Sequence, residues 1–245
     1  MIALLLSTAL TLAEMPGGDA ARFAECTTLI KSDPAKALEQ ADGWARISQD
    51  VPAQQCLGLA FVAMERWEPA ALTFAKAAED AEIHRDGRAA LLWTQAGNAA
   101  LGGDDPGKAR QYLDRAVALP TLPEPLRGEA LLDRARADVA LGDLVLGRID
   151  LDKALALVPK DPFAWLLSAT LARRQSEHER AGKDIAEATR LAPDDPAVAL
   201  EAGNIAAARG QADAATAAWT RAAQLGPRDP AGIAAANALK ANKQP

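Results

Sequence analysis

Small and bulky apolar residues alternate along the chain at the spacing of one helical face. Ala181, Ile185 and Ala188 stand at positions i, i+4 and i+7, which places them on one stripe of an α-helix. The same pattern returns 34 residues later, as Ala, Trp and Ala at positions 215, 219 and 222. The pattern therefore predicts short amphipathic helices that are organised as a repeat.

Proline, aspartate and glycine mark the ends of these helices. The segments VPKDP, APDDP and GPRDP end at Pro162, Pro196 and Pro230, again 34 residues apart. The first proline of each segment cannot continue a helix. The aspartate then caps the next helix, and the second proline takes its first position, where no N–H is needed. Gly142 and Gly210 interrupt the helical pattern about 14 residues into their units, so each unit is predicted to be two helices joined by a short turn.

This repeat resembles the tetratricopeptide repeat family. The family motif has a Leu-Gly pair and a bulky residue in the first helix, Ala, a bulky residue and Ala in the second, and a closing proline. Residues 51–84 match it through Leu57-Gly58, Phe61, Ala70, Phe74 and Ala77. The other clear matches are Trp93, Gly97, Ala109, Leu113 and Ala116 in 90–123, Trp165, Ala181, Ile185, Ala188 and Pro193 in 162–195, and Gly203, Ala215, Trp219, Ala222 and Pro227 in 196–229.

Two segments match the motif less well, and two insertions interrupt its register. Residues 128–161 have Gly147 where alanine is usual, and residues 18–50 carry only Ala37, Ala41 and Trp44 in the columns of the second helix. The insertions lie near Arg85–Ala89 and around Leu122–Arg127. Both segments still keep the order of two helices and a turn.

The resemblance implies an all-α fold, a right-handed α-solenoid of about six helix pairs over residues 18–245. The expected repeats are residues 18–50, 51–84, 90–123, 128–161, 162–195 and 196–229. Residues 230–245 are expected to form a C-terminal capping helix, because stacked repeats need a polar outer face at their ends. By resemblance, the first helices line the concave side.

The N-terminus has a different character from the repeats. Residues 2–13, IALLLSTALTLA, are apolar and uncharged, too short to cross a bilayer but of the length of a signal-peptide core. We expect a signal peptide at 1–13, cleaved after Ala13, a short linker at 14–17, and a periplasmic or secreted mature protein. No basic residue precedes the apolar run, so either the signal is atypical or the true start lies upstream.

Composition and charge exclude several classes of function. The chain has 27 basic and 33 acidic residues and a single Tyr, which argues against a nucleic-acid partner. Two His and two Cys do not form a recognisable metal motif, and no nucleophile is matched to a base by any known motif. We therefore expect no cofactor, no metal, no catalysis, and no membrane span after the signal is removed.

The two cysteines, Cys26 and Cys56, fall in the first helices of adjacent expected repeats. By resemblance, neighbouring first helices lie side by side, so the two side chains are within reach of each other. In an exported protein they are expected to form a disulfide. In a cytosolic protein both would instead be small buried hydrophobes.

The groove residues are estimated by stepping one repeat at a time along the first helices. One column holds Asn98, Arg136, Thr170 and Asn204, and an earlier column begins with Gln55 and Thr94. Gln95, Asp133 and Glu201 lie beside the earlier column, and Arg173 and Arg174 end the first helix of residues 162–195. The carboxylate clamp of the chaperone-binding members is not supported, because Thr94 and Leu200 stand where that clamp needs lysine.

The leading interpretation is a non-catalytic scaffold or adaptor that binds a peptide or protein segment in this groove, in the cell envelope. Two alternatives remain open. One is a cytosolic scaffold whose N-terminus is an ordinary apolar helix. The other is an enzyme or small-ligand site within the groove, which a deep apolar pocket with convergent polar groups would favour.

Overall fold

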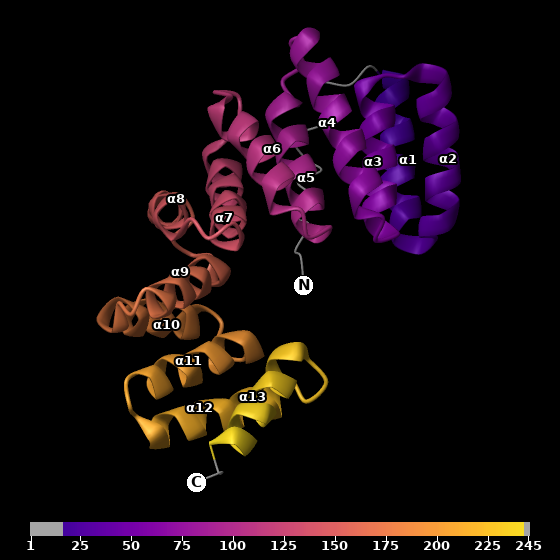
Figure 1. Ribbon diagram of the computed structural model, residues 1–245. Helices are drawn as coiled ribbons and strands as arrows, with labels where there is room; N and C mark the ends of the chain where they lie inside the picture. The colour runs from indigo at the N-terminus through magenta and orange to yellow at the C-terminus, as the bar shows by residue number, and fades with distance from the viewer. Residues whose placement is uncertain (1–16, 243–245) are drawn as a thin grey trace. The chain divides into compact units, whose positions relative to one another are not determined.

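The computed structural model describes residues 17–242, and this part of the chain is all α-helical, with thirteen helices (Figure 1). The helices are α1 (Gly17–Ser32), α2 (Pro34–Ser48), α3 (Val51–Ala63), α4 (Trp67–Ile83), α5 (Ala89–Gly102), α6 (Pro106–Ala118), α7 (Glu124–Ala140), α8 (Leu144–Leu157), α9 (Pro162–Arg174), α10 (His178–Leu191), α11 (Pro196–Ala208), α12 (Ala212–Leu225) and α13 (Pro230–Ala241). This confirms the predicted all-α class of repeated helix pairs with a final single helix. The expected signal peptide, 1–13, lies outside the described residues, as does the expected linker apart from Gly17.

The chain divides into two compact units. Unit 1 ends at Gly142 and contains α1–α7, and unit 2 begins at Asp143 and contains α8–α13. Within unit 1, successive helices from α1 to α6 stand side by side, and within unit 2 the same holds for α9 to α13 (Figure 1). The boundary falls inside the expected repeat 128–161, so its two helices, α7 and α8, belong to different units.

The aspartate–proline segments start helices as their chemistry predicts. Asp161, Asp195 and Asp229 each accept a hydrogen bond from a backbone N–H of the following helix, at 2.7–2.8 Å. The proline after each aspartate is the first residue of α9, α11 or α13. Such a cap is worth about 1 kcal/mol per helix, and seven helices of the described chain begin with an aspartate cap of this kind.

Within most pairs, a bulky side chain of the second helix fills a space that a small residue of the first helix leaves open. In unit 1, Phe74 of α4 packs directly on Gly58 of α3, where a Cβ would lie 2.5 Å from the Phe74 ring. In unit 2, Trp219 packs in the same way on Gly203 and leaves no room for a Cβ there. Phe74 is fully buried and Trp219 nearly so. These tight contacts explain why glycine stands in the first helix at these positions.

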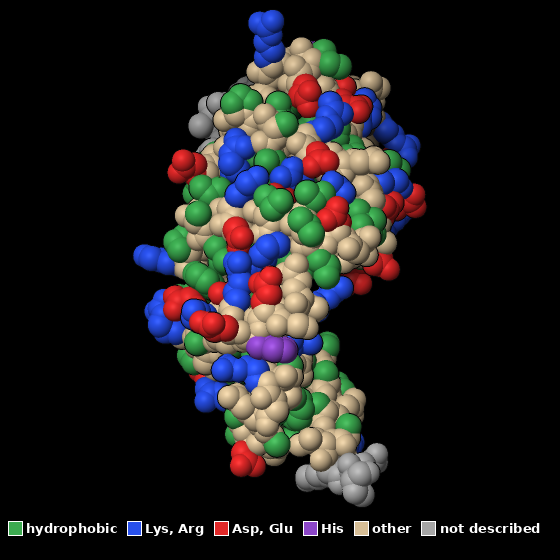
Figure 2. All heavy atoms as spheres, turned by 60° about the vertical axis from the view of Figure 1, so that its left-hand side comes forward, with side chains coloured by type: hydrophobic (Ala, Val, Ile, Leu, Met, Phe, Trp, Pro, Cys, Tyr) green, Lys and Arg blue, Asp and Glu red, His purple; other side chains and the backbone are tan. Residues whose placement is uncertain are grey.

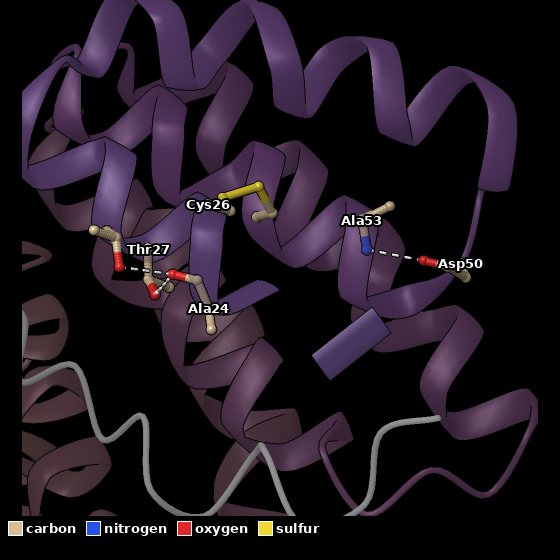
Figure 3. The surroundings of a disulfide bond; sticks show 7 residues. Ala24, Cys26, Thr27, Asp50 and Ala53 are labelled. Carbon is tan, nitrogen blue, oxygen red and sulfur yellow. Dashed lines mark hydrogen bonds between the residues drawn. A yellow bond between two sulfur atoms is a disulfide. The ribbon is translucent and has the colours of Figure 1, made fainter. Parts of the chain in front are cut away.

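A disulfide joins Cys26 of α1 to Cys56 of α3, with the two Cα atoms 6.2 Å apart (Figure 3). Both residues are buried. The start of α3 is fixed nearby by Asp50, whose side chain accepts a hydrogen bond from the Ala53 N–H at 2.9 Å (Figure 3). The predicted pairing of the two cysteines is thus confirmed, and it ties the first helix to the first helix of the next pair.

The two insertions between pairs are held in place by arginines. In the segment before α5, the Arg88 side chain donates to Asp86 at 2.8 Å. Burial raises the pKa of Asp86, but hydrogen bonds from the Arg88 side chain and backbone outweigh it, so the pKa lies below its usual 3.8. In the segment before α7, Arg127 donates to the carbonyls of Val117, Leu119 and Leu122 at 2.5–3.3 Å. Both insertions are therefore built into unit 1 by charge-assisted hydrogen bonds.

Candidate functional site

The expected groove residues all lie on first helices of the pairs. Asn98 is on α5, Asp133 and Arg136 are on α7, Thr170, Arg173 and Arg174 are on α9, and Asn204 is on α11. The first three belong to unit 1 and the other four to unit 2. The groove residues of unit 1 and those of unit 2 differ in the hydrogen bonds that they form.

In unit 1, three amide side chains gather on α3 and α5. Gln55 donates through Nε2 to Oε1 of Gln95 at 3.2 Å, and Asn98 lies one turn further along α5. Gln55 is 1% exposed, whereas Gln95 and Asn98 are half-buried. The Gln55 and Asn98 amide oxygens are buried without a hydrogen-bond partner. We call Gln55, Gln95 and Asn98 the amide cluster.

An unmet buried acceptor is costly, because the group has lost water without gaining a replacement. The amide cluster holds two such oxygens, both within unit 1. An amide offers an acceptor and two donors, so it matches the alternating C=O and N–H groups of an extended peptide backbone. The cluster therefore has unused hydrogen-bonding capacity.

On α7, the two expected residues pair with each other. Arg136 donates through Nη1 to Oδ1 of Asp133 at 2.8 Å. The side chains are 30% and 15% exposed, so the guanidinium keeps a surface open to solvent. A guanidinium that reaches the surface can contact a carboxylate or a carbonyl of a partner.

In unit 2, Asn204 and Arg173 belong to a closed network. Arg173 of α9 forms two hydrogen bonds to the Glu201 carboxylate of α11, at 2.6 and 3.2 Å. Asn204 donates to the same carboxylate at 3.1 Å and accepts from the Trp219 indole N–H at 3.0 Å. Glu201 is only 6% exposed. The network thus ties α9, α11 and α12 together through satisfied groups.

Thr170 and Arg174 complete the expected set. Thr170 is half-buried on α9, and Arg174 is exposed at the C-terminal end of the same helix. A cation at that end interacts favourably with the helix dipole. The described structure brings neither of them into the network of Arg173.

A second polar cluster in unit 2 was missed by sequence reasoning. Arg148 of α8 donates to Ser168 Oγ of α9 at 2.9 Å, and Ser168 donates to Asp184 of α10 at 2.5 Å. Arg180 pairs with both Asp184 and Asp152. Ser168 is fully buried and Asp184 nearly so. The repeat pattern contains no signal for it, because the pattern does not show which charged side chains become buried.

The two arginines of this cluster respond to it in opposite ways. Burial lowers the pKa of Arg148, and the nearby Arg180 lowers it further, against the pull of Asp152 and Asp184. Burial also acts to lower the pKa of Arg180, but the hydrogen bond and charge of Asp152, together with Asp184, raise it overall. The cluster is a set of mutually neutralising groups that holds α8, α9 and α10 together.

The charged side chains of the surface are mixed in sign, and the described residues form neither a metal-binding group nor a helix suited to cross a membrane. Figure 2 shows basic and acidic side chains interspersed over one face of the molecule. Across residues 17–242, no group of three or more His, Cys, Asp or Glu side chains is placed to hold a metal ion. In that same stretch, no helix has both the length and the apolar character needed to cross a membrane.

No protein-family model matches the chain, and no curated protein matches it either. Several solved structures share its architecture. PilW, described as a widely conserved type IV pilus biogenesis factor, is 18% identical, with a TM-score of 0.75 over 90% of this chain and 99% of its own. PilF of Pseudomonas aeruginosa is 16% identical, with a TM-score of 0.72 over 90% and 97%. YrrB, a tetratricopeptide repeat (TPR) protein with an unusual peptide-binding site, is 17% identical, with a TM-score of 0.58 over 82% and 99%. The chain therefore has the tetratricopeptide repeat fold.

Proposed function

We propose that this chain is a non-catalytic adaptor of the cell envelope, periplasmic or secreted, that binds an extended segment of a partner protein along the first helices of unit 1. The tetratricopeptide repeat fold supports a role in protein interaction, because stacked helix pairs present an extended surface. The proposed mature chain begins after Ala13, and residues 18–245 form its repeat domain.

The amide cluster carries the proposal. In its column, Gln55 stands where Leu132 stands on α7 and where Leu166 and Leu200 stand in unit 2. A buried amide in place of leucine is costly unless something satisfies it. The Gln55 and Asn98 oxygens have no partner within the described chain, and the N–H groups of an extended peptide would supply donors to them. Arg136, beside Asp133, is proposed to take a carbonyl or carboxylate of the same segment.

The residues of unit 2 are proposed to play a lesser part in recognition. Asn204 and Arg173 already use their hydrogen-bonding groups within the chain. Thr170 and Arg174 are proposed as partner-binding residues of unit 2 in their own right, with Arg174 as an exposed cation.

The envelope location rests on three observations. A disulfide between Cys26 and Cys56 is typical of proteins in oxidising compartments. Residues 2–13 have the composition of a signal-peptide core. PilW, which shares the fold, is described as a type IV pilus biogenesis factor.

The recognition surface is tested by site-specific photocrosslinking in the native host. A benzophenone amino acid replaces Gln95 in the amide cluster or, as a matched control, Gln111 on the exposed face of α6. We expect a discrete crosslinked partner from position 95 and none from position 111. The Asn98→Ala substitution should weaken crosslinking at position 95 by about 5- to 50-fold, as the loss of one or two hydrogen bonds predicts. Equal crosslinking from both positions would contradict the assignment.

Export is tested separately by the intact mass of the protein purified from its host. Cleavage after Ala13 predicts a mature chain that starts at Glu14. A mass that retains Met1 in the functional protein would refute the proposed signal peptide but leave the binding surface untouched.

A further inference from the structure

A cavity of about 300 Å³ lies between α1, α2 and α3, beside the disulfide and partly open to solvent. Its apolar wall comes from Leu29, Ala37, Ala41 and Ile47, and from the sulfur atoms of Cys26 and Cys56. Arg22, Glu25 and Gln40 supply polar groups at its edge. This cavity is separate from the amide cluster of α3 and α5.

The cavity exists because the first helix pair lacks the side chain that fills this space in the other pairs. At the repeat column of Ala41, the later pairs carry Phe74, Leu113, Leu151, Ile185 and Trp219, all of them buried. Sixteen positions before each of Phe74, Leu113 and Trp219 stands the glycine that receives it, whereas Glu25 stands sixteen positions before Ala41. The first pair therefore replaces a bulky residue and a glycine by alanine and a carboxylate, and the space stays open.

Trp44 gives the cavity a buried donor. It occupies the column in which the other pairs have alanine, at positions 77, 116, 154, 188 and 222. Its indole Nε1 is buried with no acceptor in the described chain. Three other indoles are satisfied: Trp93 donates to Glu82, Trp165 to the Pro159 carbonyl and Trp219 to Asn204. A buried indole N–H normally finds a hydrogen-bond partner. We therefore expect a bound ligand to supply the acceptor for Trp44 Nε1.

Arg22 adds a charge to this donor. Its guanidinium lies 6.0 Å from the centroid of the Trp44 ring, and it forms no ion pair within residues 17–242. The side chain is exposed, so an incoming anion does not need to displace a partner. Glu25, one turn further along α1, also lines the cavity, so a ligand with a second negative charge would be repelled there.

We infer that this cavity is a binding site for a small monocarboxylate with an apolar body, aromatic or branched aliphatic. The carboxylate accepts from Trp44 Nε1 and faces Arg22, and the apolar body lies against Ala37, Ala41 and the disulfide. At about 30 Å³ for each water-sized group, the volume holds about ten non-hydrogen atoms. At about 0.3–0.5 kcal/mol per non-hydrogen atom, a ligand of this size is expected to bind with a Kd of about 0.2–6 mM. The site is independent of the proposed binding of a protein segment.

The test uses the full oxidised chain and phenylacetate, which has ten non-hydrogen atoms. The ¹⁵N-edited spectrum reports the Trp44 indole N–H directly, and the Trp44→Phe variant assigns that resonance. We expect phenylacetate to shift this resonance in a saturable way at millimolar concentration and to leave the Trp93 indole unaffected. No saturable shift up to about 10 mM, a concentration above the expected Kd, would overturn the inference.

Two variants separate the site from a general effect. Ala41→Leu restores the residue type found at Leu113 and Leu151 and should abolish binding without lowering the melting temperature. Ala118→Leu, on the exposed end of α6, is the matched control and should bind as the parent does. Trp44→Phe keeps an aromatic ring at this position but removes the indole N–H, and should weaken binding about 5- to 10-fold by calorimetry.

The contribution of the ligand's negative charge is tested with phenylacetamide, which has the same shape as phenylacetate but is neutral. At low salt, the acid should bind at least about threefold more tightly than the amide, and the Arg22→Gln variant should remove this difference. Equal affinity for the two compounds, or unchanged binding in Ala41→Leu, would overturn the assignment.

Discussion

Unit 1 and unit 2 are built from the same helix pair but hold it together in different ways. In unit 1, a single apolar cluster runs from Phe23 in α1 to Ala137 in α7, and a disulfide links its first and third helices. The described part of unit 2 has smaller apolar clusters, around Ile185 and around Trp219, and buried ionic groups reinforce them. The repeat motif sets the positions of the helices, and the chemistry at each contact varies between pairs.

The two units also differ in what their polar side chains leave unused. In unit 2, the buried carboxylates of Asp184 and Glu201 are met by arginines and hydroxyl or amide groups of neighbouring helices. In unit 1, two oxygens of the amide cluster have no partner within the described residues, and both belong to first helices of the predicted groove. The described part of unit 2 also has two buried polar atoms without a partner, Arg148 Nε and Gln175 Oε1, but neither belongs to an expected groove residue. A polar group that is satisfied within the chain contributes to the fold, whereas an unsatisfied one is available for a ligand. This contrast is the reason to place recognition in unit 1.

The largest expected effect comes from removing the bulky residue that closes a pair in unit 1. Phe74→Ala should lower the free energy of unfolding by about 4 kcal/mol, because the vacated space opposite Gly58 is not refilled. Urea unfolding followed by tryptophan fluorescence measures the change. Leu72→Ala, on the exposed face of the same helix, is the matched control and should cost about 0.5 kcal/mol. Similar costs for the two variants would mean that the apolar column does not hold unit 1 together.

Reduction of the disulfide is expected to have the next largest effect, and only on unit 1. The bond closes a loop between residues 30 positions apart, which predicts a loss of about 3–4 kcal/mol in the chain-entropy account. Hydrogen exchange with and without reductant should show faster exchange in α1–α3 and no change in unit 2. The Cys26→Ala/Cys56→Ala double variant should show the same faster exchange in α1–α3, and reductant should not change its exchange rates. Two reactive thiols in the unreduced, denatured protein would show that the bond is absent.

In unit 2, the corresponding weak point is the polar cluster of α8–α10. Arg148→Met should cost about 3 kcal/mol, because Ser168 and Asp184 lose a buried cationic partner. Faster hydrogen exchange should be confined to α8, α9 and α10. Lys153→Met, at an exposed position of α8, should change stability little. If Arg148→Met is neutral, apolar contacts are enough to hold unit 2, and the contrast between the units disappears.

The sequence predicted the features that depend on local chemistry. Asp161 and Pro162 start α9 as expected, because capping and proline geometry act over a few residues. The cysteine pairing was also predicted, since the repeat brings first helices together. The Arg148 cluster was not predicted, because it joins three helices and no period reveals which surface charges become buried. The cavity at Ala41 left only a faint signal, a small residue in a bulky column, whose meaning depends on what surrounds it.

The smallest effect gives the sharpest comparison of the two units, because it uses one residue type in one repeat column. Asn204→Ala removes the acceptor of the Trp219 indole and a donor to Glu201, so it should cost about 1–2 kcal/mol. Asn98→Ala removes an amide whose oxygen has no partner, so it should change the free energy of unfolding by less than about 0.5 kcal/mol. Partner crosslinking at position 95 should respond in the reverse order, falling in Asn98→Ala and persisting in Asn204→Ala. If both variants lose stability equally, Asn98 is a structural residue like Asn204, and the surface for recognition has to be sought away from the first helices.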